Sequence, residues 1–253
     1  MEFIISGTTD IGTKKKINQD SLFVRKMATK TGEMVLAVLC DGMGGLKKGE
    51  LASASIVDAF TDWMYICLPE LSQKSLEDYV IREQWTAIIA EQNEKIRAYG
   101  QQKGCHIGST VTVLLLTKER YFLLAVGDSR AYEIDNEIKQ LTVDHTVMER
   151  EIERGNITIE QARDIPIRGV LTKCVGVANE VYPDMFFGDT KTNAMYMLCS
   201  DGFCHQIDAE EIENVMKREP KGSGMKNKEV FLVELNKQRG ETDNISVITI
   251  VTK

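Results

Sequence analysis

The chain has 253 residues, and its 31 Lys and Arg against 38 Asp and Glu give a formal net charge of −7. Hydrophobic residues make up 43% and charged residues 27%, which is typical of a globular protein with a sizeable core and excludes disordered and fibrous classes. The acidic balance argues against nucleic acid as a partner, because binding to a phosphate backbone requires clustered Lys and Arg.

Short apolar runs in the first forty residues predict strands at residues 3–5, 21–24 and 34–40. The last run is apolar throughout, as expected of a strand buried on both faces. It is also the longest apolar run in the chain and is too short to span a bilayer. No signal peptide is visible, and the six cysteines form no C-x-x-C pair. These features predict a cytoplasmic protein with reduced thiols.

Helices are predicted in the following segment. Apolar residues at helical spacing run from Ala52 to Cys67, and Pro69 is expected to end this helix. A second helix is expected to begin near Ser75, which can cap it, and its apolar stripe continues to Ile96. These two helices form the first helical block.

The middle of the chain returns to strands. Residues 111–116 and 121–126 predict a hairpin, since a short polar connector joins them. The stretch from His145 to Arg168 is polar and contains two capping boxes, at Thr146 and Thr158. It is predicted to form two short helices in an exposed insertion.

Strands are predicted again at residues 195–199 and 245–251, separated by an Asp208-capped helix and a helix at residues 225–238. Strands near both ends with helices in blocks favour an α+β fold over an alternating parallel sheet. The linker at residues 220–224 is too short to divide domains, so residues 1–253 are predicted to form a single domain.

Five aspartates stand near glycine or asparagine and next to apolar runs: Asp20, Asp41, Asp128, Asp201 and Asp243. Any single Asp-Gly is more often a turn than a ligand, so the prediction rests on the set. Carboxylates that converge repel one another unless a cation lies among them. Oxygen ligands with few histidines suit Mg²⁺ or Mn²⁺.

Seven short motifs in order along the chain carry a resemblance to a known family. They are Asn18-Gln19-Asp20, Asp41-Gly42-Met43-Gly44-Gly45, Gly108-Ser109-Thr110, Gly127-Asp128-Ser129-Arg130, Asp144-His145-Thr146, Ser200-Asp201-Gly202 and Thr242-Asp243-Asn244. The series resembles the metal-dependent type 2C (PPM) protein serine/threonine phosphatases in their bacterial form. This resemblance implies a four-layer α-β-β-α sandwich, with two central antiparallel β-sheets flanked by helices.

The resemblance also implies a site. Asp41 is expected to bridge two Mn²⁺ or Mg²⁺ ions and, with Asp201 and Asp243, to form the catalytic set. The carbonyl of Gly42 is expected to bind one ion, Asp20 to contact metal-bound water, and Asp128 to share a possible third ion with Asp201. The insertion at about residues 145–168 corresponds to the family's mobile flap.

The implied reaction is metal-dependent hydrolysis of phosphoserine and phosphothreonine in proteins. A water nucleophile activated at a dinuclear centre attacks phosphorus directly. The expected partners are therefore phosphorylated proteins, the targets of a Ser/Thr kinase, with no nucleic acid and no membrane. Because no helix stands out as an oligomerisation element, a monomer is expected.

The chain departs from the family at the usual phosphate-binding arginine, where it has Lys15. Lysine offers a point charge in place of a planar fork, so bidentate phosphate binding is lost. We expect Lys15 to meet the substrate phosphate weakly, although an exposed basic run is an equal alternative. Met43 is expected to pack, which leaves the general acid unassigned, and His145 is expected to fix a loop.

Two other functions fit the same residues. One is a pseudophosphatase that serves as a regulatory binding module, which the full carboxylate set argues against. The other is a two-metal hydrolase of small phosphate esters. Turnover of a phosphothreonine peptide and of an aryl phosphate, with Mn²⁺ or EDTA, distinguishes the three.

Overall fold

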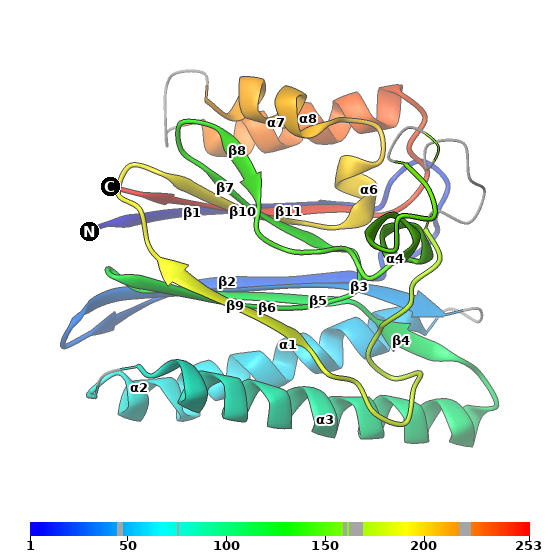
Figure 1. Cartoon of the computed structure of the whole chain (residues 1–253), viewed down its shortest axis with the longest axis horizontal. Helices are drawn as coiled ribbons and strands as arrows, with labels where there is room; N and C mark the ends of the chain where they lie inside the picture. Colours follow the sequence, from blue (N-terminus) through cyan, green and yellow to red (C-terminus); the bar gives the residue numbers. More distant parts are fainter. Residues whose placement is uncertain (45–47, 75, 159–160, 162–168, 218–223) are drawn as a thin grey trace.

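Two antiparallel sheets lie face to face between two layers of helices in a computed structural model (Figure 1). The structure describes residues 1–44, 48–74, 76–158, 161, 169–217 and 224–253. The chain thus forms the four-layer α-β-β-α sandwich that the sequence predicted. Chain direction alternates at every pairing between neighbouring strands.

Each sheet joins strands from distant parts of the chain. The first sheet has the order β1 (Phe3–Asp10), β11 (Ile245–Thr252), β10 (Met195–Cys199), β7 (Arg130–Ile134) and β8 (Ile138–Gln140). The second has the order β2 (Asp20–Thr29), β3 (Gly32–Gly44), β5 (Val111–Leu116), β6 (Arg120–Val126) and β9 (Asp184–Asp189), and β4 (Ile107–Ser109) pairs with the end of β3. The predicted hairpin is β5–β6.

Strand β3 shows why the sheets stack. Its side chains alternate between two hydrophobic clusters, so that Leu36 and Val38 face the helices while Val35 and Leu39 face the opposite sheet. All four side chains have no exposed surface. The uninterrupted apolar run therefore predicted the two-sided burial correctly.

Helices cover the outer face of each sheet (Figure 1). On the second sheet lie α1 (Gly49–Ile66), α2 (Leu68–Leu71) and α3 (Asp78–Lys103), and on the first lie α6 (Asp201–Cys204), α7 (Ala209–Met216) and α8 (Met225–Gln238). Helix α7 begins at the predicted Asp208 cap, which accepts a hydrogen bond from the backbone of Glu211 at 2.9 Å. Pro69 does not end α1 directly, since it lies in the first turn of α2, where its missing N–H costs nothing.

The polar insertion begins as predicted. Thr146 caps α4 (Val147–Glu153), where its side chain accepts a hydrogen bond from the backbone of Glu149 at 3.1 Å. At the second predicted helix, Thr158 and Gln161 exchange the hydrogen bonds of a capping box. The body of that helix, the Ser75 cap and most of the 220–224 linker lie outside the described residues.

No helix of the described residues is long and apolar enough to cross a membrane. All six cysteines are free, and Cys40 and Cys199 are buried.

An aromatic cluster joins α1 to α3. The ring of Trp85 meets Phe60 and Trp63 edge to face, with centroids 5.8 and 5.5 Å apart. Trp85 has no exposed surface, whereas Tyr79 on the same helix is 68% exposed. Trp85 therefore anchors α3 to α1 through area and ring geometry.

Trp85→Ala is expected to lower the free energy of unfolding by about 3–5 kcal/mol, because it leaves a cavity between α1 and α3. Tyr79→Ala, the control on the same helix, should change it by less than about 0.5 kcal/mol. Urea unfolding followed by far-UV circular dichroism measures both, and equal losses would contradict the anchoring role.

Candidate functional site

The predicted aspartates lie where strands end. Asp20 begins β2 and stands opposite Asp41 of β3 in the sheet register. Asp201 follows β10 as the first residue of α6, Asp243 precedes β11, and Asp128 lies between β6 and β7. Strands of both sheets thus bring the five carboxylates to one end of the sandwich.

Glycines next to these aspartates allow close backbone contact. A Cβ on Gly42 would lie 2.2 Å from the carbonyl oxygen of Gly49, so the start of α1 packs directly on the end of β3. Gly127 has φ +109° and lies against Thr110, and this conformation turns the chain before Asp128. Only glycine fits both requirements without strain.

Burial and mutual repulsion dominate the electrostatics of the site. Burial raises the pKa of Asp41 well above its ordinary value, and the charges of Asp20 and Asp201 raise it further. Burial, together with the charge of Asp201, likewise raises the pKa of Asp20 and of Asp128 to about 7. Without a cation, these carboxyl groups must therefore either hold a proton or repel one another as buried charges.

Unpartnered oxygens show what these carboxyl groups lack. Both side-chain oxygens of Asp20 and Oδ1 of Asp201 are buried with no hydrogen-bond partner of acceptable geometry. Ser200 and Ser246 lie close enough to Asp20 to lower its pKa in part. A divalent cation would satisfy the orphaned oxygens and offset the repulsion, so the residues fit Mg²⁺ or Mn²⁺.

The carboxylates nevertheless form no closed cage. In the described part of the chain, no three His, Cys, Asp or Glu side chains meet closely enough to hold a metal ion. An open arrangement of this kind is typical of Mg²⁺ and Mn²⁺ sites, where water and backbone oxygens complete the coordination.

Lys15 lies at the rim of this cluster, with its Nζ 2.8 Å from Oδ1 of Asp243. Burial alone would lower the pKa of Lys15, but the contact with Asp243 and the charges of Asp41 and Asp201 raise it. Its loop is held by Asn244, whose Nδ2 donates to the carbonyls of Ile11 and Ile17. Lys15 therefore contacts the carboxylate cluster through Asp243, while its side chain is 41% exposed.

His205 is a member of the site that sequence reasoning missed. Its Nε2 lies 3.3 Å from Oδ2 of Asp201 and its Nδ1 lies 3.1 Å from Oε2 of Glu241. The hydrogen bond with Glu241 raises the pKa of His205 to about 9, although burial opposes it. The available signal was the four-residue spacing from Asp201, which places both side chains on one helical face.

Glu241 links His205 to the loop before β11. Its Oε1 accepts the backbone N–H groups of Thr242 and Asp243 at 2.6 and 2.8 Å. Burial opposes ionisation, but the hydrogen bonds from His205 and from the backbone hold the pKa of Glu241 at about 2. The charged pair therefore fixes the backbone of Asp243 relative to Asp201.

A cavity of about 150 Å³ opens beside the cluster, lined by Asp128, Asp201 and His205 among others. Its wall includes Arg130, which binds the carboxylate of Asp144 through Nε and one terminal nitrogen at 3.0 and 2.7 Å. This bidentate pair fixes the start of the insertion beside the site.

His145 fixes a loop, as expected. Its Nδ1 accepts the N–H of Gly127 at 3.0 Å, which leaves the proton on Nε2, 3.2 Å from Oδ2 of Asp184. Burial lowers the pKa of His145. The neutral ring therefore connects the turn before Asp128 to the insertion.

Comparisons with known proteins show which family the chain resembles in sequence and in fold. A family model described as Protein phosphatase 2C matches residues 7–218. The serine/threonine phosphatase stp of Listeria welshimeri is 29% identical, over 96% of this chain and 93% of its own. The solved serine/threonine phosphatase of S. agalactiae covers 100% of both chains with a TM-score of 0.85 and 28% identity.

A further solved structure bears on the cation. The catalytic domain of the serine threonine protein phosphatase PstP, in complex with two manganese ions, is 25% identical and has a TM-score of 0.78, with 99% of each chain covered. Manganese is one of the two ions that the orphaned oxygens fit here.

In EDTA, the free energy of unfolding is expected to fall by about 1–3 kcal/mol between pH 6 and pH 8. Asp20 and Asp128 have folded pKa values of about 7, above the ordinary value, so folding binds protons that the unfolded chain has lost. The stabilisation is fully present below the unfolded pKa, is lost progressively as the pH rises from that value to the folded pKa, and is absent above it. His205, with a folded pKa of about 9, contributes with the same sign.

Asp20→Asn provides the control, because it removes one of the titrating groups. Its fall between pH 6 and pH 8 should be about 1 kcal/mol smaller than that of the wild type. Chemical unfolding at several pH values measures both slopes, and an identical slope in the variant would contradict the raised pKa of Asp20.

Proposed function

The chain belongs to the protein phosphatase 2C family and is a serine/threonine protein phosphatase, and we propose that it acts through divalent ions bound at the end of its sandwich. The orphaned, buried oxygens of Asp20 and Asp201 carry this proposal, since they lie in a cluster that repels itself without a cation. The manganese complex of PstP supports it.

Asp41, Asp201 and Asp243 would hold the ions, with the carbonyl of Gly42 as a backbone ligand and Asp20 oriented toward ion-bound water. Bound Mn²⁺ or Mg²⁺ supplies Lewis acidity, which activates water as the nucleophile and neutralises the phosphoryl oxygens. Asp128 lines the adjoining cavity together with Asp201 and is suited to a third, weaker ion.

Other residues of this chain position the ligands. His205 and Glu241 hold Asp201 and the backbone of Asp243 at fixed places. The hydroxyl group of Thr110 accepts a hydrogen bond from the backbone N–H of Asp41 at 2.9 Å. Preorganisation of this kind reduces the cost of assembling the charged site when substrate arrives.

We further propose that Lys15 contacts the substrate phosphate. Its ammonium already lies among the carboxylates through Asp243, and a cation bound by Asp243 would leave Lys15 available for an anion. A single ammonium gives one charged contact, so its contribution is to binding more than to the reaction itself.

Asp41→Ala and Asp243→Ala are each expected to lower kcat on a phosphothreonine peptide with Mn²⁺ by at least about 100-fold, since each removes a ligand of the activating ions. Thermal unfolding should also lose most of its shift on addition of Mn²⁺. Asp189→Asn, at the distant end of β9, is the matched control and should retain both. Full activity in either alanine variant would contradict the ligand assignment.

Lys15→Ala is expected to raise KM for the phosphothreonine peptide by about 3–10-fold with a smaller change in kcat, because a charge-assisted hydrogen bond contributes about 1 kcal/mol. Lys15→Arg should keep or lower KM, since it restores a bidentate fork. Initial rates at saturating Mn²⁺ separate the two constants. Unchanged KM in both variants would remove Lys15 from the substrate site.

A further inference from the structure

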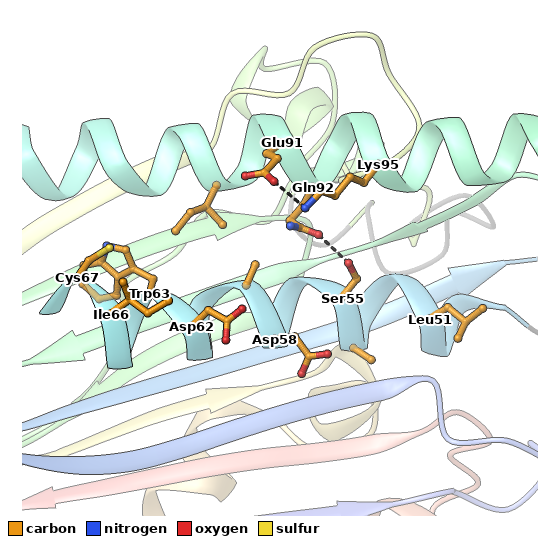
Figure 2. A pocket seen from close by; sticks show the side chains of 13 residues that line it. Leu51, Ser55, Asp58, Asp62, Trp63, Ile66, Cys67, Glu91, Gln92 and Lys95 are labelled. Carbon is orange, nitrogen blue, oxygen red and sulfur yellow. Dashed lines mark hydrogen bonds and ion pairs between the residues drawn. The ribbon is translucent and has the colours of Figure 1, made fainter.

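A groove of about 610 Å³ runs between α1 and α3, and none of the proposed metal ligands lines it (Figure 2). Small or apolar side chains form its floor, with Ala54, Ala59 and Trp63 from α1 and Ile88 from α3. Ser55 donates a hydrogen bond to Gln92 at 2.7 Å across the floor, as Figure 2 shows. The alanines leave room for another chain to approach the helices closely.

Exposed apolar side chains stand at both ends of this groove. Leu51 is 47% exposed and Ile66 is 73% exposed. Fifteen residue steps separate Leu51 from Ile66, a rise of about 22 Å along α1, which is the length of a helix of four turns. The apolar hollow continues past Leu51 into a second space of about 270 Å³ beside Tyr99 and Ile107.

Acidic side chains line the groove. Asp58 and Asp62 lie on successive turns of α1, and Glu91 lies on α3 (Figure 2). Lys95 pairs with Glu91 at 2.6 Å. In the part of the chain that the structure describes, Asp58 and Asp62 form no ion pair. Two uncompensated charges therefore border an apolar floor.

We propose that the groove between α1 and α3 is a docking site for a cationic amphipathic helix of a partner protein. Such a helix places its apolar face on the alanine floor and on Leu51 and Ile66, and its Lys or Arg side chains opposite Asp58 and Asp62. A second copy of this chain is disfavoured, because a symmetric dimer through this face would bring the same acidic side chains together.

The probe is a fluorescent 18-residue peptide of leucine and lysine patterned as an amphipathic helix, and anisotropy measures its binding to the full-length protein. Asp58→Lys combined with Asp62→Lys is expected to weaken binding at least tenfold. Ala59→Trp, which fills the floor without changing charge, should do the same. Both variants should keep wild-type turnover of an aryl phosphate, which shows that they fold.

Glu83→Lys combined with Glu137→Lys is the matched control, because it makes the same change of charge at exposed positions outside the groove. This variant should bind the peptide within twofold of the wild type. A peptide of leucine and glutamate with the same pattern should bind at least tenfold more weakly.

Several results would overturn the proposal. They are no binding to the wild type, equal losses in the groove and control variants, or equal binding of the glutamate peptide. If the double lysine variant does not fold, Ala59→Trp decides alone. Sedimentation velocity that showed dimers disrupted by Ala59→Trp would make a second copy the occupant and would also overturn it. A failure here leaves the phosphatase proposal untouched, because turnover is measured separately.

Discussion

Repulsion among desolvated carboxylates at one end of the sandwich is the interaction on which the rest of the site depends. The sheet register places Asp20 directly opposite Asp41, and the neighbouring sheet adds Asp201 and Asp243. Asp20 and Asp41, which are both buried, would gain by moving into water or away from the neighbouring carboxylates. The fold prevents both movements, so a cation that relieves the repulsion would bind more tightly.

The scaffold resists the repulsion because buried hydroxyl groups tie the strand ends together. The hydroxyl group of Thr110 accepts a hydrogen bond from the backbone N–H of Asp41 and forms another with the hydroxyl group of Ser129, at 2.9 Å in both cases. The hydroxyl group of Ser200 accepts a hydrogen bond from the backbone N–H of Ser246 at 3.0 Å. The hydroxyl group of Ser53 on α1 donates a hydrogen bond to the carbonyl of Gln19 at 2.6 Å. These contacts lie at the end of a dry core whose strands cannot slip without exposing apolar side chains.

The sequence predicted the parts of this architecture that depend on local pattern. Strand β3 was predicted from its apolar run, α1 from its spacing, and the caps of α4 and α7 from their Thr and Asp residues. Strands β4, β7, β8 and β9 were not predicted. Strands β4 and β8 are only three residues long, the side chains of β9 are only half buried, and β7 carries Arg130 and Glu133 among its five residues. Short or half-buried strands lack a clear apolar alternation.

The sequence motifs indicated the aspartates of the candidate site, but they did not indicate the contacts that surround these side chains. The aspartates were recognised as a set, but their cross-strand register is a tertiary property that no local pattern encodes. His205 and Glu241 stand 36 residues apart, and only the packing of α6 beside the loop before β11 brings them together. The sequence did not predict the groove between α1 and α3 either, since alanine and serine are common at any position of a helix.

Strand β1 has only β11 as a sheet neighbour, and the backbones of Glu2 and Lys253 exchange hydrogen bonds at 3.0 and 2.9 Å. Strand β1 can therefore complete its pairing only after β11 has been synthesised. Asp243 directly precedes β11, so a nascent chain carries the other four carboxylates before it carries this one. A chain interrupted before β11 would lack both the partner of β1 and one of the five clustered aspartates.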